Sequence, residues 1–246
     1  MYSKLCIAVL FFITVLFVGC EPSVKDGLPY EEYIKMVQTY LNDGDYDRAI
    51  AAGKKAVRIK PTDGETHYLL ATLYYEAYRK NLDAAQMKGL QDAILNPNKR
   101  RNSDSIEELR KFGYKPELKI LAFQEFKETV KYSPSNWFAC YMIATDYFNN
   151  KYFREAIDEY KKVIAINPNF ANAHALMGES YYKLGDFKSA VLSIETAVKI
   201  DPSAYNYCQL GLAYRKANNM KKYVEIAAKL KGMDKGYYDQ LVNPLN

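Results

Sequence analysis

Residues 174–202, HALMGESYYKLGDFKSAVLSIETAVKIDP, contain two helical patterns joined by a turn. The first pattern has four residues spaced so that they lie on one face of a helix, as residues that pack against a second helix do. They are His174, Met177, Gly178 and Tyr181. Gly185 marks the turn into the second pattern, which stops before Pro202. The stretch therefore predicts a hairpin of two packed helices.

The proline that ends this hairpin belongs to a series along the chain. Its members are Pro61, Pro97, Pro134, Pro168 and Pro202, spaced by 36, 37, 34 and 34 residues. Twelve residues before each proline stands an alanine, namely Ala49, Ala85, Ala122, Ala156 and Ala190. Twelve residues make slightly more than three helical turns, so each alanine is expected near the start of a helix that ends before its proline. The period predicts an array of helical hairpins.

This pattern resembles the tetratricopeptide repeat (TPR), a helix-turn-helix unit of 34 residues. The clearest unit matches it with His174, Met177, Gly178, Tyr181, Ala190, Ile194 and Pro202. The unit before it supplies Cys140, Ile143, Ala144, Tyr147, Ala156, Tyr160 and Pro168, and the first unit supplies Tyr33, Met36, Val37, Tyr40, Ala49, Gly53 and Pro61. The resemblance covers about residues 30–236. It implies an all-α fold, a right-handed α-solenoid of stacked helical hairpins.

The resemblance divides the chain into about six units, of which units two and three are irregular. The expected bounds are 30–63, 64–99, 100–136, 137–170, 171–204 and 205–236, followed by a C-terminal cap or tail at 237–246. In unit two, we expect two extra residues in the turn before Ala85. Unit three has a short first helix near 106–112, interrupted by Gly113 and Pro116. Five units with one insertion at 79–115 is the alternative.

The first twenty residues differ from the rest of the chain. An apolar run at 5–19 is shorter than the ~20 residues that a transmembrane helix needs and is typical of an export signal. Cys20 follows it, and the junction resembles the lipobox of bacterial lipoproteins, although Phe17 stands where that family prefers Leu. The resemblance implies a signal peptide at 1–19 and a lipidated Cys20. An uncleaved short anchor and an ordinary cleaved signal are the alternatives.

A lipid on Cys20 would place the protein in a bacterial cell envelope. The tether at 20–29 is short, so the repeat body is expected close to the membrane on its periplasmic face. Glu21 follows the cysteine, whereas Asp at this position retains some lipoproteins at the inner membrane. We therefore expect the outer membrane rather than the inner one.

The resemblance also implies where a partner would bind. In the TPR family, positions 2, 5, 9, 12 and 13 of each unit point into a concave groove, which suits an extended peptide or an amphipathic helix. The corresponding residues here are Tyr68, Tyr75, Phe138, Tyr141, Thr145, Phe148, Asn149, Asn172, Glu179, Tyr182 and Lys183, to which unit six adds Tyr205, Arg215 and Lys216 if it is shifted by one residue. Packing between units is the alternative interpretation of these aromatic residues.

Several classes of function find no support in the sequence. The 34 basic and 29 acidic residues are interspersed and give a net charge of only +5, which does not indicate a nucleic-acid partner. His67 and His174 occupy the same core position of their units, so we expect both to be buried rather than catalytic or metal-binding. The acidic run 43–47 lacks the glycine and closing glutamate of a calcium loop and is expected to be a turn. Cys140 and Cys208 are expected to be small buried residues.

The sequence thus predicts a membrane-anchored, non-catalytic adaptor without cofactor or metal, which binds a protein or peptide in its groove and serves envelope, pilus or secretion assembly. The chain is expected to be a monomer before its partner binds. A carrier of a small lipid or glycan in the same groove is one alternative. A structural subunit that self-associates through the ends of the array is the other.

Overall fold

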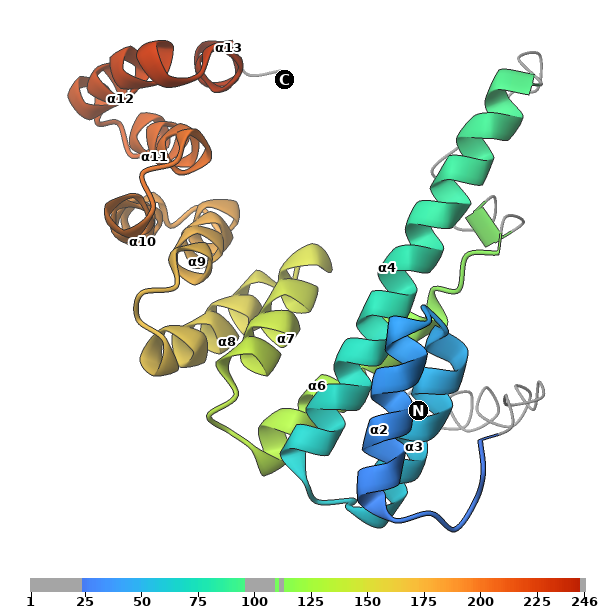
Figure 1. The fold of residues 1–246 in the computed structure, drawn as a ribbon. Coiled ribbons are helices and arrows are strands. Elements are labelled where there is room, and N and C mark those ends of the chain that lie inside the picture. The colour runs from blue at the N-terminus through green and yellow to red at the C-terminus, as the bar shows by residue number, and fades with distance from the viewer. Residues whose placement is uncertain (1–23, 96–108, 111–112, 244–246) are drawn as a thin grey trace, which may run out of the picture. The chain divides into compact units, whose positions relative to one another are not determined.

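The computed structural model describes residues 24–95, 109–110 and 113–243, and its elements are α-helices (Figure 1). The chain divides into two compact units, each larger than a single repeat: unit 1 extends to Glu125, and unit 2 begins at Phe126. From here on, unit 1 and unit 2 mean these two parts of the chain. The eleven helices of the described residues are α2 (Tyr30–Asn42), α3 (Tyr46–Ile59), α4 (Gly64–Leu95), α6 (Glu117–Tyr132), α7 (Trp137–Asn149), α8 (Phe153–Ile166), α9 (Ala171–Lys183), α10 (Phe187–Ile200), α11 (Ala204–Lys216), α12 (Met220–Met233) and α13 (Lys235–Val242). The predicted all-α fold of stacked hairpins is confirmed.

Unit 1 begins with the hairpin of α2 and α3, as the first repeat predicts. Gly44 adopts φ +72° in the turn, a conformation that L side chains rarely adopt. Asp45 caps α3, because its Oδ1 accepts a hydrogen bond from the Arg48 backbone N–H at 2.9 Å. α3 ends at Ile59, just before Pro61. The acidic run at 43–47 therefore forms the predicted turn together with the first two residues of α3.

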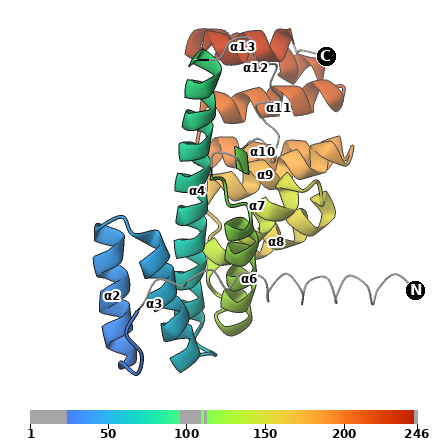
Figure 2. The same cartoon turned by 90° about the vertical axis from the view of Figure 1, so that its right-hand side faces the viewer.

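The expected turn before Ala85 is absent, and this prediction is wrong. α4 is one helix of 32 residues that begins with the second repeat and continues through the expected turn to Leu95 (Figures 1 and 2). The expected turn region contains no Gly or Pro, which are the strongest interruptions of a helix. Asn81, which could have capped a turn, donates instead from Nδ2 to the Gly113 carbonyl at 2.7 Å. The division into six units stays a prediction.

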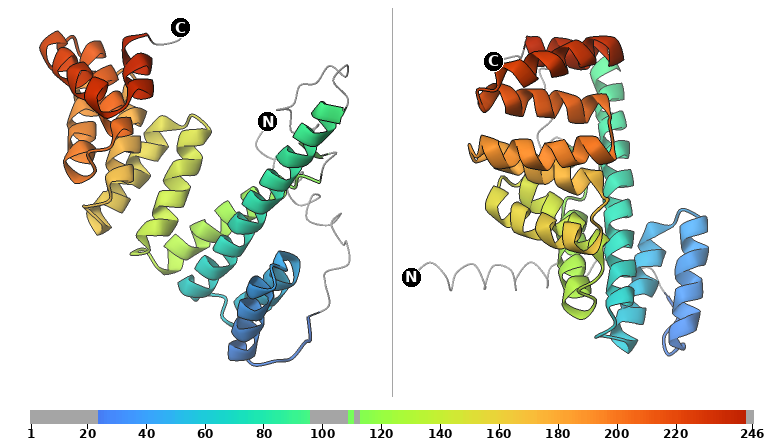
Figure 3. Two further views of the ribbon diagram at one scale, coloured as in Figure 1. Left: turned by 45° about the horizontal axis from the view of Figure 1, so that its top comes forward. Right: turned by 90° about the vertical axis from the view of Figure 1, so that its left-hand side faces the viewer.

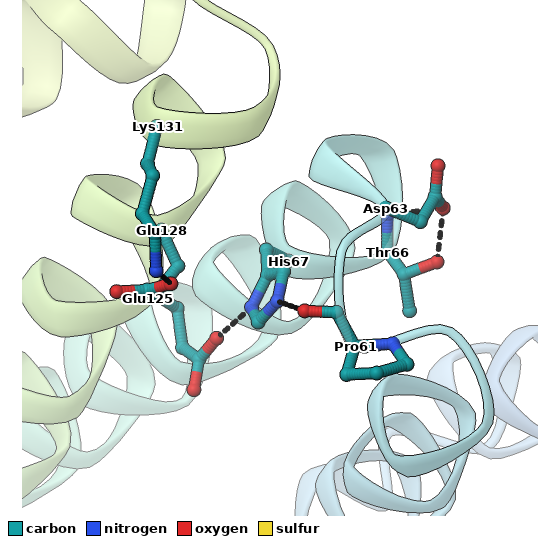
Figure 4. A network of polar contacts seen from close by, with 7 residues as sticks. All are labelled: Pro61, Asp63, Thr66, His67, Glu125, Glu128 and Lys131. Atoms are coloured by element: carbon teal, nitrogen blue, oxygen red, sulfur yellow. Dashed lines mark hydrogen bonds and ion pairs between the residues drawn. The ribbon is translucent and has the colours of Figure 1, made fainter.

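A buried histidine joins the start of α4 to α6 (Figure 4). His67 is 6% exposed, and its Nδ1 lies 2.6 Å from Oε2 of Glu125. Its Nε2 lies 3.1 Å from the Pro61 carbonyl oxygen. The ring therefore bridges a side chain of α6 and the backbone that precedes α4. His67 is thus a structural link, as expected for a core position.

Unit 2 contains three hairpins, α7/α8, α9/α10 and α11/α12, which lie in successive layers in Figures 2 and 3. Small residues permit the close approach of their helices. Ala156 and Ala190 are fully buried, and a Cβ on Gly178 would lie 2.5 Å from Cγ1 of Ile194. These are the positions at which the repeat pattern demands small side chains.

The last helix, α13, closes the C-terminal end of unit 2. Leu241 is fully buried, and a Cβ on Gly211 would lie 2.7 Å from its Cδ2. The sequence predicted a cap or tail from residue 237, and the helix occupies Lys235–Val242. No helix in residues 24–95 or 113–243 is long and apolar enough to cross a membrane.

Candidate functional site

The first helices of the three hairpins in unit 2 are neighbours. α7 contacts α9, and α9 contacts α11. We call the surface that these three helices share the first-helix face. Of the predicted binding residues, Tyr141, Thr145, Glu179 and Tyr205 make contacts that link these helices to one another or to the helices beside them, and Phe138 packs on Tyr141 within α7.

Aromatic rings gather where α7 and α9 begin. Trp137 and Tyr141 each have their ring centroid 4.9 Å from that of Phe170, the residue that precedes α9. Phe138 lies 6.2 Å from Tyr141. The tilted and edge-to-face angles are those that aromatic pairs prefer. All four side chains are partly exposed, so the cluster combines internal packing with an accessible apolar surface.

Tyr160 of α8 lies beneath this cluster and connects it to the next residues of the face. It is fully buried, with its ring centroid 6.2 Å from Tyr141 and its hydroxyl 3.4 Å from the Thr145 hydroxyl. Burial, followed by the neighbouring Tyr141, Glu179 and Tyr205, raises the pKa of Tyr160. Residues from α7, α8, α9 and α11 therefore converge around one neutral phenol.

Glu179 and Tyr205 are the polar part of this convergence. The Tyr205 hydroxyl of α11 donates to Oε2 of Glu179 on α9 at 3.3 Å, and Lys183 Nζ lies 3.9 Å from the Oε1 atom. Burial and then Glu179 raise the pKa of Tyr205 to about 12. Tyr205 remains 37% exposed, and its ring centroid lies 6.3 Å from that of Tyr237. A carboxylate thus stands among tyrosines at an accessible position.

Three other predicted residues make contacts within their own part of unit 2. Phe148 packs on Phe153 at 5.7 Å and Tyr182 on Phe187 at 5.4 Å, each joining the two helices of one hairpin. The Arg215 Nη1 atom donates to the Leu241 carbonyl at 3.3 Å and so holds α13. Such contacts are what the packing alternative expects for these three residues.

The remaining predicted residues lie apart from this convergence. Asn149 and Asn172 are exposed on α7 and α9. Tyr68 and Tyr75 lie on α4 of unit 1, where Tyr75 packs 6.2 Å from Tyr78. Cys20 is outside the described residues. For all of the predicted residues, a role in binding a partner stays a prediction.

Sequence reasoning missed three aromatic residues of the site and assigned a fourth only to the core. Trp137 and Phe170 flank the repeat positions that the family uses for binding, and Tyr237 belongs to the segment predicted as a tail. The sequence correctly predicted Tyr160 as a core aromatic residue, but not its contacts with Tyr141 and Thr145 of the first-helix face. A search for aromatic residues adjacent to the groove positions would have found Trp137.

Unit 1 contains a separate pocket of about 550 Å³ beside the turn between α2 and α3. Several of its charged side chains have partners close by. Asp45 binds Arg48, Asp47 lies 3.9 Å from Lys115, and Lys80 Nζ lies 4.6 Å over the Tyr46 ring. Across the described part of the chain, no group of His, Cys, Asp and Glu residues could hold a metal ion.

The core histidines and cysteines have structural positions in the described units. His174 is 9% exposed, and its Nε2 lies 2.9 Å from the Pro168 carbonyl oxygen, which repeats the contact of His67 with Pro61. Cys140 and Cys208 are buried free thiols, and burial raises the pKa of both. The predicted burial of these four residues is confirmed.

The fold and this face define a helical-repeat protein. Comparison with known families identifies the repeats: residues 33–63 and 171–204 match models described as tetratricopeptide repeat, and residues 146–185 match one described as TPR repeat. These three stretches of the chain are therefore tetratricopeptide repeats.

Solved structures with the same fold include two of MamA. A crystal structure of the MamA protein is 21% identical with a TM-score of 0.60, covering 88% of this chain and 96% of that one. The 41-end form of MamA from Desulfovibrio magneticus RS-1 is 18% identical with a TM-score of 0.59, covering 86% and 98%. At this identity, the likeness concerns the fold.

Two curated relatives are subunits of complexes. Anaphase-promoting complex subunit 3 of Dictyostelium discoideum is 32% identical over 79 residues, which is 32% of this chain. The BBSome complex member BBS4 homolog of Drosophila melanogaster is 22% identical over 214 residues, with 72% of this chain covered. The chain spans only 8% and 43% of the lengths of these two relatives.

Proposed function

We propose that this protein is a non-catalytic, membrane-anchored adaptor that holds an extended peptide segment of a partner protein on the first-helix face of unit 2. The observation that carries the proposal is a pair of contacts that involve three successive first helices: Tyr141 of α7 packs on the buried Tyr160, and Tyr205 of α11 donates to Glu179 of α9. A surface that crosses several repeats can contact several consecutive residues of a peptide.

The chemistry of this face suits a peptide better than catalysis. Tyrosine side chains provide large apolar contact area together with a hydrogen-bonding hydroxyl, and they are enriched at energetically dominant positions of interfaces. The two histidines of the chain are buried and bound to backbone carbonyls, so neither is presented as a general base. Relatives whose names identify them as members of complexes also support an adaptor.

The proposed anchor is a lipid on Cys20, in the envelope of a bacterium and at the periplasmic face of the outer membrane. The apolar run at 5–19, the small Gly19 before the cysteine and the following Glu21 support this location. The partner would then belong to envelope, pilus or secretion assembly. A Cys20→Ser variant is expected to leave the membrane fraction and to lose incorporation of labelled palmitate. Retention of both in the variant would contradict the anchor.

The binding site is tested by co-purification from native membranes after cross-linking. A Tyr141→Ala, Tyr205→Ala double variant is expected to lose the partner, because truncation of a central aromatic at an interface commonly costs 2 kcal/mol or more, about thirtyfold in affinity. The control is Tyr152→Ala, since Tyr152 is 57% exposed in the turn between α7 and α8. If the double variant retains every partner of the wild type, the first-helix face is not the site.

A further inference from the structure

We propose that the peptide held on the first-helix face presents an arginine or lysine side chain to Glu179, with arginine preferred. This inference rests on the proposed function and specifies the chemistry of the partner. It follows from the position of one carboxylate among aromatic rings and from the contacts that this carboxylate makes.

Glu179 has hydrogen-bonding capacity that its intramolecular contacts use only in part. An ionised carboxylate offers about four acceptor positions on its two oxygens. Here the Oε2 atom accepts one bond from the Tyr205 hydroxyl at 3.3 Å, and the Oε1 atom has Lys183 Nζ at 3.9 Å, beyond hydrogen-bonding distance. The Glu179 side chain is 19% exposed and Lys183 is 48% exposed. The carboxylate is thus partly desolvated and incompletely paired.

A peptide that covers this face must satisfy the Glu179 charge. Removing a carboxylate from water without a partner is costly, and the cost falls if the covering group is a cation that donates hydrogen bonds. An uncharged peptide could donate hydrogen bonds to Glu179 but would bring no charge to compensate for its desolvation. Charge complementarity therefore favours a basic side chain over a neutral or acidic one.

The rings around Glu179 favour arginine in particular. Tyr205, whose hydroxyl contacts Glu179, is 37% exposed and has the Tyr237 ring 6.3 Å away, centroid to centroid. A guanidinium can stack on an aromatic face while its N–H groups form paired hydrogen bonds to a carboxylate. Lysine supplies the charge but neither the planar stacking nor the fork of donors, so its binding should be weaker.

A peptide library tests this chemistry without knowledge of the natural partner. The full-length protein is used to select from a random dodecapeptide phage library, in parallel with the variants Glu179→Gln and Tyr141→Ala, Tyr205→Ala. Glu155→Gln is the matched control, because Glu155 is an exposed acid in the first turn of α8. We expect peptides selected by the wild type and by Glu155→Gln to be enriched in arginine, and Glu179→Gln to lose that enrichment.

The selected arginine is then examined in the best peptide itself. Trp137 is the only tryptophan of the chain and lies 4.9 Å from Phe170, which contacts Tyr141, so its fluorescence reports binding at this face. Replacing the arginine by citrulline, its neutral isostere, should weaken binding to the wild type at least about tenfold, as expected for loss of a charge-assisted pair. The same replacement should change binding to Glu179→Gln less than about threefold.

The outcomes separate this inference from the proposed function. Peptides that depend on Tyr141 and Tyr205 but contain no excess of arginine or lysine would overturn the inference and leave the peptide-binding site intact. Failure of the selection, or selected peptides that bind the tyrosine double variant as well as the wild type, would overturn both. A basic preference that survives in Glu179→Gln would also overturn the assignment to this carboxylate.

Discussion

The two units contain the same alanine and proline signals of the repeat, but these signals accompany different helix arrangements. In unit 2, each first helix is followed by a turn and a second helix, and Gly185 (φ +81°) lies in one of these turns. Among the described residues of unit 1, only the hairpin of α2 and α3 has this form, and the helix that follows it is the unbroken α4. Alanine and proline at the expected spacing do not make a hairpin without residues that stop the first helix.

The comparison extends to the position at which the TPR pattern places an aromatic residue. Unit 2 has the buried Tyr160 there in its first hairpin, whereas unit 1 has Gly53, where an added Cβ would lie 3.1 Å from Cδ1 of Leu73. In unit 1 the neighbouring leucine fills the space, and in unit 2 the ring fills it. The aromatic surface that we assign to binding therefore packs on a buried tyrosine, Tyr160, for which the first hairpin of unit 1 has a glycine.

The largest expected effect concerns this aromatic position. Tyr160→Ala should destabilise unit 2 by about 3–5 kcal/mol, because a fully buried ring leaves a cavity. Tyr160→Phe should cost about 1 kcal/mol or less, since it removes only the 3.4 Å contact with Thr145. Urea unfolding followed by Trp137 fluorescence measures both. Equal costs for the two variants would show that packing of the ring is not what stabilises the unit.

The next effect tests the continuity of α4. Asp83→Pro should destabilise unit 1 by about 3 kcal/mol, because proline inside a helix removes a backbone hydrogen bond and clashes with the preceding turn. Asp83 is exposed, so loss of its side chain contributes little. Asp83→Ala is the control, and circular dichroism during thermal unfolding measures the change. Tolerance of proline within about 0.5 kcal/mol would instead indicate the turn that the repeat pattern predicts.

A smaller loss of stability is expected when the contact between His67 and Glu125 is removed. Glu125→Gln should destabilise the protein by about 1–2 kcal/mol, because His67 loses a charge-assisted hydrogen bond at 2.6 Å. His67→Gln in the Glu125→Gln background should then add less than it does in the wild type. His174 is held at its Pro168 carbonyl in the same manner, so His174→Gln serves as the reference in unit 2. Additive effects of the His67 and Glu125 changes would contradict the coupling.

The smallest effect is a pH dependence in unit 2. The Tyr214 hydroxyl, and then Lys222, hold the pKa of Glu195 below its ordinary value of 4.5. Their contribution to stability is therefore present above that value and is lost as the pH falls through the lower folded-state pKa. Glu195→Gln should flatten the acid side of the stability profile by less than about 1 kcal/mol, since the Glu195 side chain is 28% exposed. Unfolding midpoints from pH 7 to pH 3 measure it, and an unchanged profile would exclude this contribution.

The sequence predicted well where local signals and packing agree. The repeat spacing, the hairpins of α7 to α12 and the buried His67, His174, Cys140 and Cys208 follow from periodicity and from positions that demand small or core residues. The 32-residue α4 was not predicted, because the repeat period alone placed a turn before Ala85, although no Gly or Pro stands there to end the helix.

Part of the candidate site could also be predicted. Tyr141, Thr145 and Glu179 were found because the repeat register fixes which face of a first helix they occupy. Phe148, Tyr182 and Arg215 share that register, yet their contacts depend on Phe153, Phe187 and Leu241, whose approach is decided by tertiary packing. Tyr237 reaches Tyr205 because α13 folds back on α11, which repeat spacing does not encode.

The central claim is that a partner's peptide segment occupies the first-helix face, and site-specific photo-cross-linking tests it most directly. In one strain, a photoreactive phenylalanine analogue would replace Tyr205, which is 37% exposed on this face. In a second strain, it would replace Tyr152, which is 57% exposed in the turn between α7 and α8. Irradiation of intact cells should give a discrete cross-linked protein from position 205 and none from position 152. Cross-links of equal yield at both positions, or from position 152 alone, would contradict the account.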